Sequence, residues 1–298
     1  AQALQTLDED GEARPSSPSG HSPTGLPTLA KEGVNVSAEI SNGFQCSTCH
    51  IDGEFPARYS FATVTFPSGA TISLNEGDES GLCMQCHQGR QAGTDVDRAV
   101  GDLADDDVME GQRFLNVHYY AAGATRYGAE AGGGYQYAGK EYAGLFAHVP
   151  GFDTCMSCHD AHELEVQTEQ CFTCHAGDED VHDIRISETD FDGDGDTTEG
   201  IYGEIDTIKV ALYEAIVAYS IENETTNQVE FREGYPYWFA ANEGEDLIWT
   251  PTLLRAAYNY QYVSKDPGNF AHNAAYILQL LYDSIEAVGG DVSVLTRP

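Results

Sequence analysis

The chain has 298 residues, of which 41% are hydrophobic, and 49 acidic residues against 14 basic ones give it a formal net charge of −35. Such a charge excludes nucleic acid and anionic membrane surfaces as partners, and it predicts a saline setting or bound cations. No apolar run approaches the roughly eighteen residues of a transmembrane helix. The start at Ala1 without methionine suits a mature exported protein.

Residues 1–30 predict an extended N-terminal arm. The stretch RPSSPSGHSPTGLP is rich in Pro, Ser and Gly and contains His21. Because such a composition cannot form a core of its own, we expect the arm to lie along a surface, either of its own subunit or of another.

Residues 31–185 hold four copies of the pattern Cys-x-x-Cys-His, and these copies contain all eight cysteines of the chain. The spacing admits structural zinc, redox-active cysteine pairs and covalent attachment of haem c. Only 10 of 298 residues are histidine, yet one follows each cysteine pair, as haem attachment requires. The pattern therefore predicts four haem c groups and export from the cytoplasm. The attachment cysteines are Cys46, Cys49, Cys83, Cys86, Cys155, Cys158, Cys171 and Cys174, and the proximal iron ligands are His50, His87, His159 and His175.

Four further axial ligands are needed if every iron is six-coordinate. His118 and His148 have apolar and aromatic neighbours, as expected in a haem pocket, and His162 lies three residues beyond His159, where it can reach a neighbouring haem. The fourth distal ligand is either His21, which can reach a haem of another subunit from the arm, or His182. A structural role is favoured for His272. Since methionine is scarce, bis-histidine ligation is expected, and saturated irons favour electron transfer over catalysis.

The stretch 131–146, AGGGYQYAGKEYAGLF, predicts a hairpin that turns near Gly139. This hairpin would either cover haem edges or act as an aromatic packing element.

Residues 186–298 predict an acidic loop followed by a helical subdomain. Asp190, Asp192, Asp194 and Asp196 occupy calcium-loop positions, but Ile201 stands where a bidentate glutamate is expected, so Glu199 or Glu204 would have to replace it. A solvated acidic turn is the alternative.

Three helices are predicted after the loop. Apolar residues recur at three- and four-residue steps over 201–219 and again over 278–285, where the glycines at 289–290 end the pattern. Thr250 and Pro251 predict the N-cap and first residue of the helix between these two. The fold class is therefore a multihaem cytochrome c, mostly coil with short helices around stacked haems, with an α-helical C-terminal subdomain.

The sequence resembles the extracellular tetrahaem c-type cytochromes that polymerise into nanowires, known from metal-reducing bacteria and related archaea. The resemblance is carried by the four motifs, by the hairpin stretch, and by NVHYYAAGATRYG, FDTCMSCHDAHELEV and TPTLLRAAYNYQYVSKDPGNFAHN. It implies a continuous stack of bis-histidine haems, with one axial histidine donated across a subunit boundary.

Three functions follow from this interpretation. The first is electron conduction by a head-to-tail extracellular filament that meets other redox cytochromes or extracellular acceptors. The second is a discrete periplasmic tetrahaem shuttle. The third is a multihaem reductase, which would need an iron with an exchangeable position.

Overall fold

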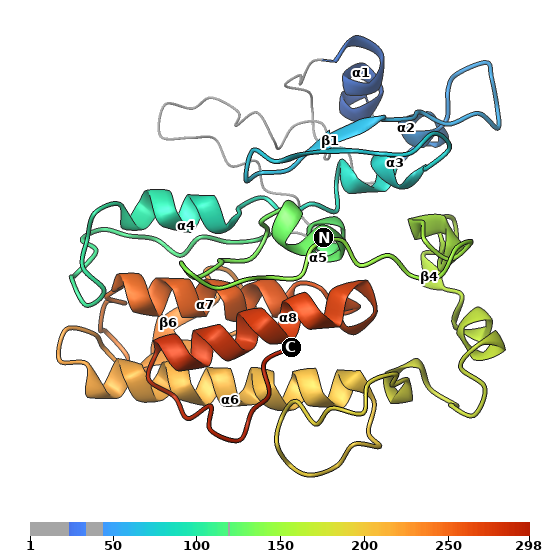
Figure 1. Ribbon diagram of the computed structural model, residues 1–298. Coiled ribbons are helices and arrows are strands. Elements are labelled where there is room, and N and C mark those ends of the chain that lie inside the picture. Colours follow the sequence, from blue (N-terminus) through green and yellow to red (C-terminus); the bar gives the residue numbers. More distant parts are fainter. Residues whose placement is uncertain (1–23, 34–43, 119) are drawn as a thin grey trace.

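The structure, a computed structural model, describes residues 24–33, 44–118 and 120–298 (Figure 1). His21 and most of the predicted arm lie outside these residues. The last residues of the predicted arm lie in the helix α1 (Gly25–Glu32), which ends at Gly33 in the left-handed conformation. Elements of the first half form the upper part of Figure 1, and three long helices form the lower part.

Short elements carry the motifs. The first two motifs lie near a small antiparallel hairpin in which Val64 pairs with Ile72. The third and fourth motifs follow each other along one side of the molecule (Figure 1). The elements are α2 (Cys46–Cys49), β1 (Thr63–Thr65), β2 (Thr71–Ser73), α3 (Ser80–Met84), α4 (Gly93–Val100), α5 (Ala122–Tyr127), η2 (Gly128–Glu130), η3 (Cys155–Ser157), β3 (His159–Asp160), β4 (Glu165–Val166), η4 (Thr168–Thr173) and η5 (Val181–Asp183).

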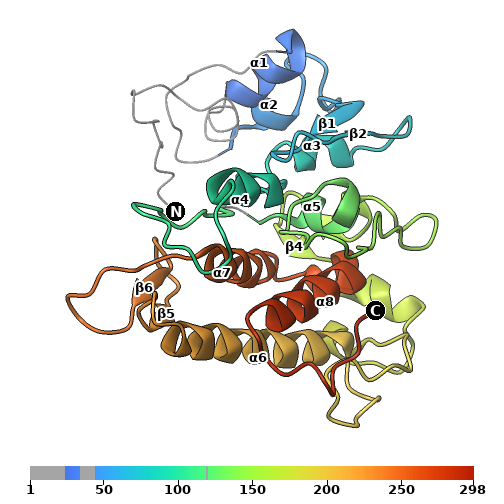
Figure 2. The ribbon, with the colours of Figure 1, turned by 60° about the vertical axis from the view of Figure 1, so that its left-hand side comes forward.

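The three helices predicted after residue 200 are present as α6 (Ile201–Glu222), α7 (Pro251–Ser264) and α8 (Asn269–Ala287). They lie side by side in both ribbon views (Figures 1 and 2). Thr250 caps α7 by accepting a hydrogen bond from the Leu253 N–H at 3.3 Å, and Pro251 opens the helix. The connection between α6 and α7 contains the hairpin of β5 (Val229–Phe231) and β6 (Trp238–Ala240), which the sequence did not predict.

The Tyr/Gly stretch 131–146 reverses direction at Gly139, whose φ is 78°, but its two arms do not pair as strands. Side chains of α7 and α8 instead accept hydrogen bonds from backbone N–H groups of this stretch. Asn259 accepts the Tyr135 N–H at 2.7 Å, and Gln279 accepts the Ala143 N–H at 2.7 Å. The predicted hairpin is therefore replaced by a loop that is hydrogen-bonded to helices, because those side chains satisfy the groups that a strand ladder would have used.

One buried cluster joins the two halves of the described chain. It contains residues of the first half, such as Val64 and Met84, together with Leu212, Leu253 and Leu281 from the three long helices. The predicted boundary near residue 185 therefore does not divide the core, and the domain division stays a prediction.

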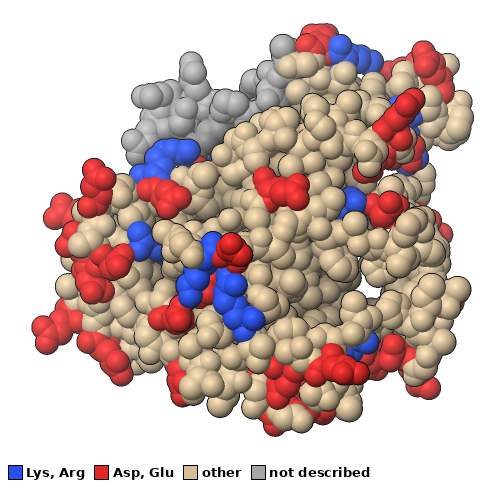
Figure 3. Space-filling view, in the orientation of Figure 1, with Lys and Arg blue, Asp and Glu red and all other residues tan. Residues whose placement is uncertain are grey.

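Figure 3 shows acidic side chains along the edges of one face, while much of its centre is uncharged. In the described residues, no helix is long and apolar enough to cross a bilayer.

Candidate functional site

Each Cys-x-x-Cys-His motif forms one tight turn. The histidine N–H donates to the carbonyl of the first cysteine in the first, second and fourth motifs, at 2.8, 3.0 and 2.9 Å. In the third motif, the Cys158 N–H donates to the Cys155 carbonyl at 3.2 Å. Residues three apart in such a turn lie on the same side, so each motif presents its two thiols together.

The cysteines are free and none is fully buried; Cys46 and Cys174 are exposed and the other six are partly exposed. Free cysteine is among the most buried residue types when its role is packing. Thiols that are paired on turns at the surface therefore suit covalent attachment of a group better than they suit a core.

Neighbouring motifs lie against one another. The thiols of Cys83 and Cys155 share a hydrogen bond, which raises the pKa of Cys83 and lowers the pKa of Cys155. Ser80, at the start of the second motif's helix, accepts the Cys155 N–H at 3.1 Å. Burial and then the nearby Cys49 thiol raise the pKa of Cys86 to about 11, so the first and second motifs lie close together.

Burial and then the Cys171 thiol raise the pKa of Cys158, so the third and fourth motifs are also close in space. The four motifs are thus linked pairwise in the order of the sequence.

Among the described residues, six histidine rings lie close together in three pairs. The ring centroids of His50 and His162 are 6.1 Å apart with an interplanar angle of 11°. Those of His148 and His175 are 6.3 Å apart. The third pair is His159 with His272, at 6.2 Å. Each pair contains one motif histidine and one histidine from outside the motifs.

The segment 148–162 contributes to all three pairs through His148, His159 and His162. Strands β3 and β4 set the spacing of the last two, since His159 pairs with Val166 and the Asp160 carboxylate accepts the His162 N–H at 2.8 Å. Three residues span at most about 10 Å, so these two rings belong to adjacent sites.

His87 is the remaining motif histidine. Burial, the largest influence, lowers its pKa, and the backbone of Tyr120 opposes that by hydrogen bonding to the ring. The predicted ligand His118 has a φ of 73°, and Asn116 accepts its N–H at 2.8 Å. The adjacent Val117 carbonyl accepts the Arg90 N–H at 2.9 Å, which places this stretch beside the residues that follow the second motif.

The surroundings of His272 and His182 bear on the roles that the sequence analysis gave them. His272, for which the sequence favours a structural role, lies opposite His159. His182, a candidate fourth ligand, packs against Tyr202 and Phe270 with ring centroids 4.3 and 5.3 Å away. Its Nδ1 lies 2.8 Å from the Asp180 carboxylate. Nothing local in the sequence marks His272, because only the fold brings α8 to the third motif.

Acceptors orient several of these rings. His50 Nδ1 lies 3.0 Å from the Pro56 carbonyl, and His272 Nδ1 lies 2.9 Å from both oxygens of Asp266. Burial opposes protonation of His272, but Asp266 outweighs it, and the pKa of His272 is raised. A partner on Nδ1 leaves Nε2 directed away from it, as in many metal-binding histidines.

The geometry fits haem. Two imidazole nitrogens bound about 2 Å from one iron on opposite sides place the ring centroids roughly 6.3 Å apart, taking about 1.1 Å from each nitrogen to its ring centre. The three observed separations, 6.1, 6.2 and 6.3 Å, match this arrangement. A Cys-x-x-Cys turn precedes one histidine of each pair.

The acidic loop forms a second cluster of charged residues. Asp190, Asp192 and Glu204 bring carboxylate oxygens within 4.8 Å of one another, and so do Asp192, Asp194 and Glu199. The Asp196 carboxylate is in neither group; it is exposed and accepts the Thr198 N–H and hydroxyl at 2.7 and 2.6 Å.

Comparison with known proteins gives two similar polyhaem cytochromes of Geobacter sulfurreducens. The chain is 25% identical over 342 aligned positions to C-type polyheme cytochrome OmcB, covering 92% of this chain and 42% of OmcB, with the same values in two strains. It is 26% identical to C-type polyheme cytochrome OmcC over 78% of this chain and 33% of OmcC. No protein-family model matches the chain, and no solved structure matches it significantly.

The chain thus spans less than half the length of the curated relatives it matches. The distant similarity and the four motifs together support a multihaem c-type cytochrome.

Proposed function

We propose that this protein transfers electrons along four covalently attached haem c groups, each with two histidine ligands. The observation that carries the proposal is the set of three histidine pairs at ring separations of 6.1 to 6.3 Å, each with one motif histidine. The cytochromes named above, which are similar over most of this chain, support the same chemistry.

The proposed sites use the chain's own residues as follows. The two cysteines of each motif hold the porphyrin by thioether links, and the motif histidine binds its iron. His162 completes the site of the first motif, His272 that of the third and His148 that of the fourth. Haem bound in this way supplies an iron that exchanges one electron without changing its ligands.

His118 is the proposed partner of His87 in the second site. The hydrogen bond between Arg90 and Val117, and another in which the Gly123 N–H donates to the His87 carbonyl at 2.8 Å, bring the chain on either side of His118 to the second motif. This assignment leaves His21 and His182 free of iron. If instead a neighbouring subunit donates one ligand, as the resemblance implies, His21 is the candidate donor.

Eight histidine ligands for four irons leave no exchangeable position, so we propose that the protein is not an enzyme. The pairwise adjacency of the motifs supports a continuous path through the molecule. Because covalent haem attachment takes place outside the cytoplasm, the proposed location is extracellular, with the periplasm as the alternative.

The resemblance to polymerising cytochromes supports a further step, in which subunits repeat head to tail as an extracellular filament. A heterologous contact of this kind does not close on itself and generates a helical assembly. Other redox cytochromes or extracellular acceptors would meet its ends.

Three measurements test these proposals, two for electron transfer and one for the filament. Intact mass spectrometry of the native protein should give the polypeptide mass plus four haems, and electron paramagnetic resonance should show only low-spin ferric iron. A haem count other than four, or a high-spin signal that responds to cyanide, would contradict the electron-transfer proposal. Negative-stain microscopy should show filaments; monodisperse particles at every salt concentration would leave the discrete shuttle.

A further inference from the structure

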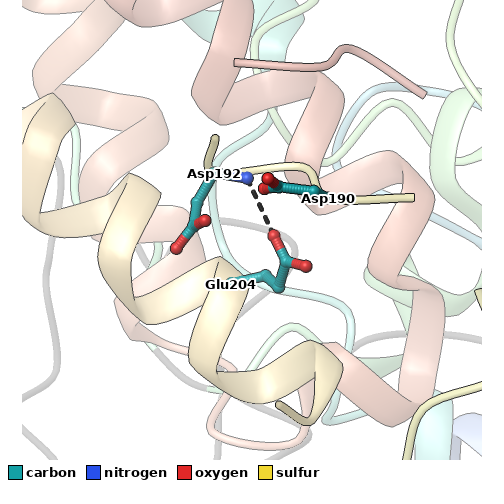
Figure 4. Close-up of side chains that lie close together, drawn as sticks. All are labelled: Asp190, Asp192 and Glu204. Atoms are coloured by element: carbon teal, nitrogen blue, oxygen red, sulfur yellow. Dashed lines mark hydrogen bonds between the residues drawn. The ribbon is translucent and has the colours of Figure 1, made fainter. Parts of the chain in front are cut away.

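The acidic loop before α6 is folded around its own carboxylates. Asp190 accepts the Gly193 and Gly195 N–H groups at 2.6 and 2.8 Å, and Asp192 accepts the Asp194 N–H at 3.1 Å. From the first turn of α6, Glu204 accepts the Phe191 and Asp192 N–H groups, both at 2.8 Å. Figure 4 shows Glu204 reaching from the helix towards the two loop aspartates.

Three side chains in this cluster, those of Asp192, Glu199 and Glu204, each have a buried oxygen without a hydrogen-bond partner. Asp192 is only 6% exposed, and its Oδ2 is buried with no hydrogen-bond donor. Glu199 Oε1 is likewise buried without a donor. A buried carboxylate oxygen that lacks a partner is costly, and a bound cation would remove that cost.

The net charge of the carboxylate cluster also favours a bound cation. Asp190, Asp192, Asp194, Glu199 and Glu204 supply five carboxylates, and Arg185 is ion-paired with one of them, its Nη2 lying 2.6 Å from Glu204 Oε1. The approach is an ion pair without the alignment of a hydrogen bond. Five negative charges and one positive charge leave a formal −4.

Mutual repulsion acts on the shared residue. Burial and then the Glu204 charge raise the pKa of Asp192, against the Asp194 N–H that lowers it. Burial and then Asp192 raise the pKa of Glu199.

We propose that Asp190, Asp192, Asp194, Glu199 and Glu204 bind one calcium ion. The two groups of three share Asp192, so one ion at Asp192 is within reach of both. Calcium fits this set because it takes six to eight oxygen ligands in flexible geometry, whereas magnesium demands a near-ideal octahedron and zinc, copper and nickel favour nitrogen or sulfur ligands. Glu199 and Glu204 together replace the single glutamate that a standard calcium loop carries at its twelfth position.

Glu199 lies close against the first turn of α6, since a Cβ at Gly203 would lie 2.1 Å from Glu199 Oε2. The same loop touches the C-terminal tail, where the Thr296 N–H donates to the Phe191 carbonyl at 2.9 Å. Arg185 joins it to the segment that follows the fourth motif by donating to the Glu199 carbonyl at 3.0 Å. The ion would therefore hold three segments together.

Isothermal titration of the calcium-free, haem-loaded full chain with CaCl₂ in physiological salt tests the proposal. We expect one site with a Kd below roughly 10⁻³ M, the range of extracellular calcium modules. Asp192→Asn should weaken binding by about tenfold or more, because it removes the buried ligand charge. The matched control Asp196→Asn lies in the same loop outside the cluster and should change Kd by less than about threefold.

Trypsin cleavage after Arg185 gives a second readout on the wild-type protein. The Arg185 side chain is 7% exposed and is ion-paired with Glu204, so cleavage there requires the loop to open. Bound calcium should oppose that opening and slow cleavage, and in Asp192→Asn this protection should disappear. Unchanged haem absorption and circular dichroism would show that the variants are folded. Absence of a calcium site in the wild type, or equal weakening by both substitutions, would overturn the proposal. If Asp192→Asn does not fold, failure of calcium to protect Arg185 in the wild type would overturn it.

Discussion

Both carboxylate oxygens of Asp266 lie 2.9 Å from Nδ1 of His272. Asp266 is 1% exposed, and His272 faces the motif histidine His159. The Nδ1 partner of His272 is thus a carboxylate, whereas the Nδ1 partner of His50 is the backbone carbonyl of Pro56. A carboxylate makes the imidazole more electron-rich and so stabilises ferric iron over ferrous iron.

Asp266→Asn should therefore raise the reduction potential of one haem. A tenfold change in the relative stability of the two oxidation states corresponds to about 59 mV for a one-electron couple, and we expect a shift on the order of that value. Spectroelectrochemical titration measures it. Asp283→Asn is the matched control, since Asp283 is also buried but pairs with Arg297 at 2.8 Å; it should leave all four potentials in place. Equal shifts in both variants would contradict a role for Asp266 at the ligand.

His272→Ala should convert one of four haems to the high-spin state, because the iron of His159 would lose its second ligand. His182→Ala should keep all four low-spin, since that ring packs against Tyr202 and Phe270. Electron paramagnetic resonance of the two purified variants distinguishes these outcomes. A high-spin signal in His182→Ala would reverse the assignment.

Substitutions of His118 and His21 distinguish a second-site iron ligand donated within the subunit from one donated by a neighbouring subunit. We expect His118→Ala to produce one high-spin haem at every protein concentration, and His21→Ala to produce none. The measurement is the high-spin fraction before and after dilution. If His21→Ala gives the signal instead, and His118→Ala does not, the ligand comes from the N-terminal arm.

Thr250→Ala should lower the free energy of unfolding by about 1 kcal/mol, with an upper value of about 2 kcal/mol, the range for lost N-caps. The Thr250 hydroxyl caps α7 and also lies 3.0 Å from the Tyr219 hydroxyl on α6. Thr225→Ala, at an exposed position, should change the same quantity by less than about 0.5 kcal/mol. Denaturant titrations followed by far-ultraviolet circular dichroism provide both values.

The sequence predicts the parts of this molecule that depend on neighbouring residues. The periodicity of α6, the Thr250 cap and the glycines after α8 are local signals, and all three helices are present where they were predicted. The Cys-x-x-Cys-His turns are equally local.

Features that depend on distant contacts were harder to predict. His272 lies 113 positions after His159, and only the packing of α8 places the two rings together. The hairpin predicted around Gly139 does not form for a similar reason, because Asn259 and Gln279 accept hydrogen bonds from its backbone N–H groups. Glu204 joins the acidic loop because α6 begins beside it.

The placement of His148, His159 and His162 within fifteen consecutive residues concentrates three of the proposed iron ligands on one short length of chain. Under the proposed ligation, local fraying of this stretch would detach ligands from the first, third and fourth haems together, while the second would stay ligated. The proposed electron path would then be lost as a single event during heating, before the buried helices melt. Its thermal endurance would thus be set by a surface segment, and not by the apolar interior.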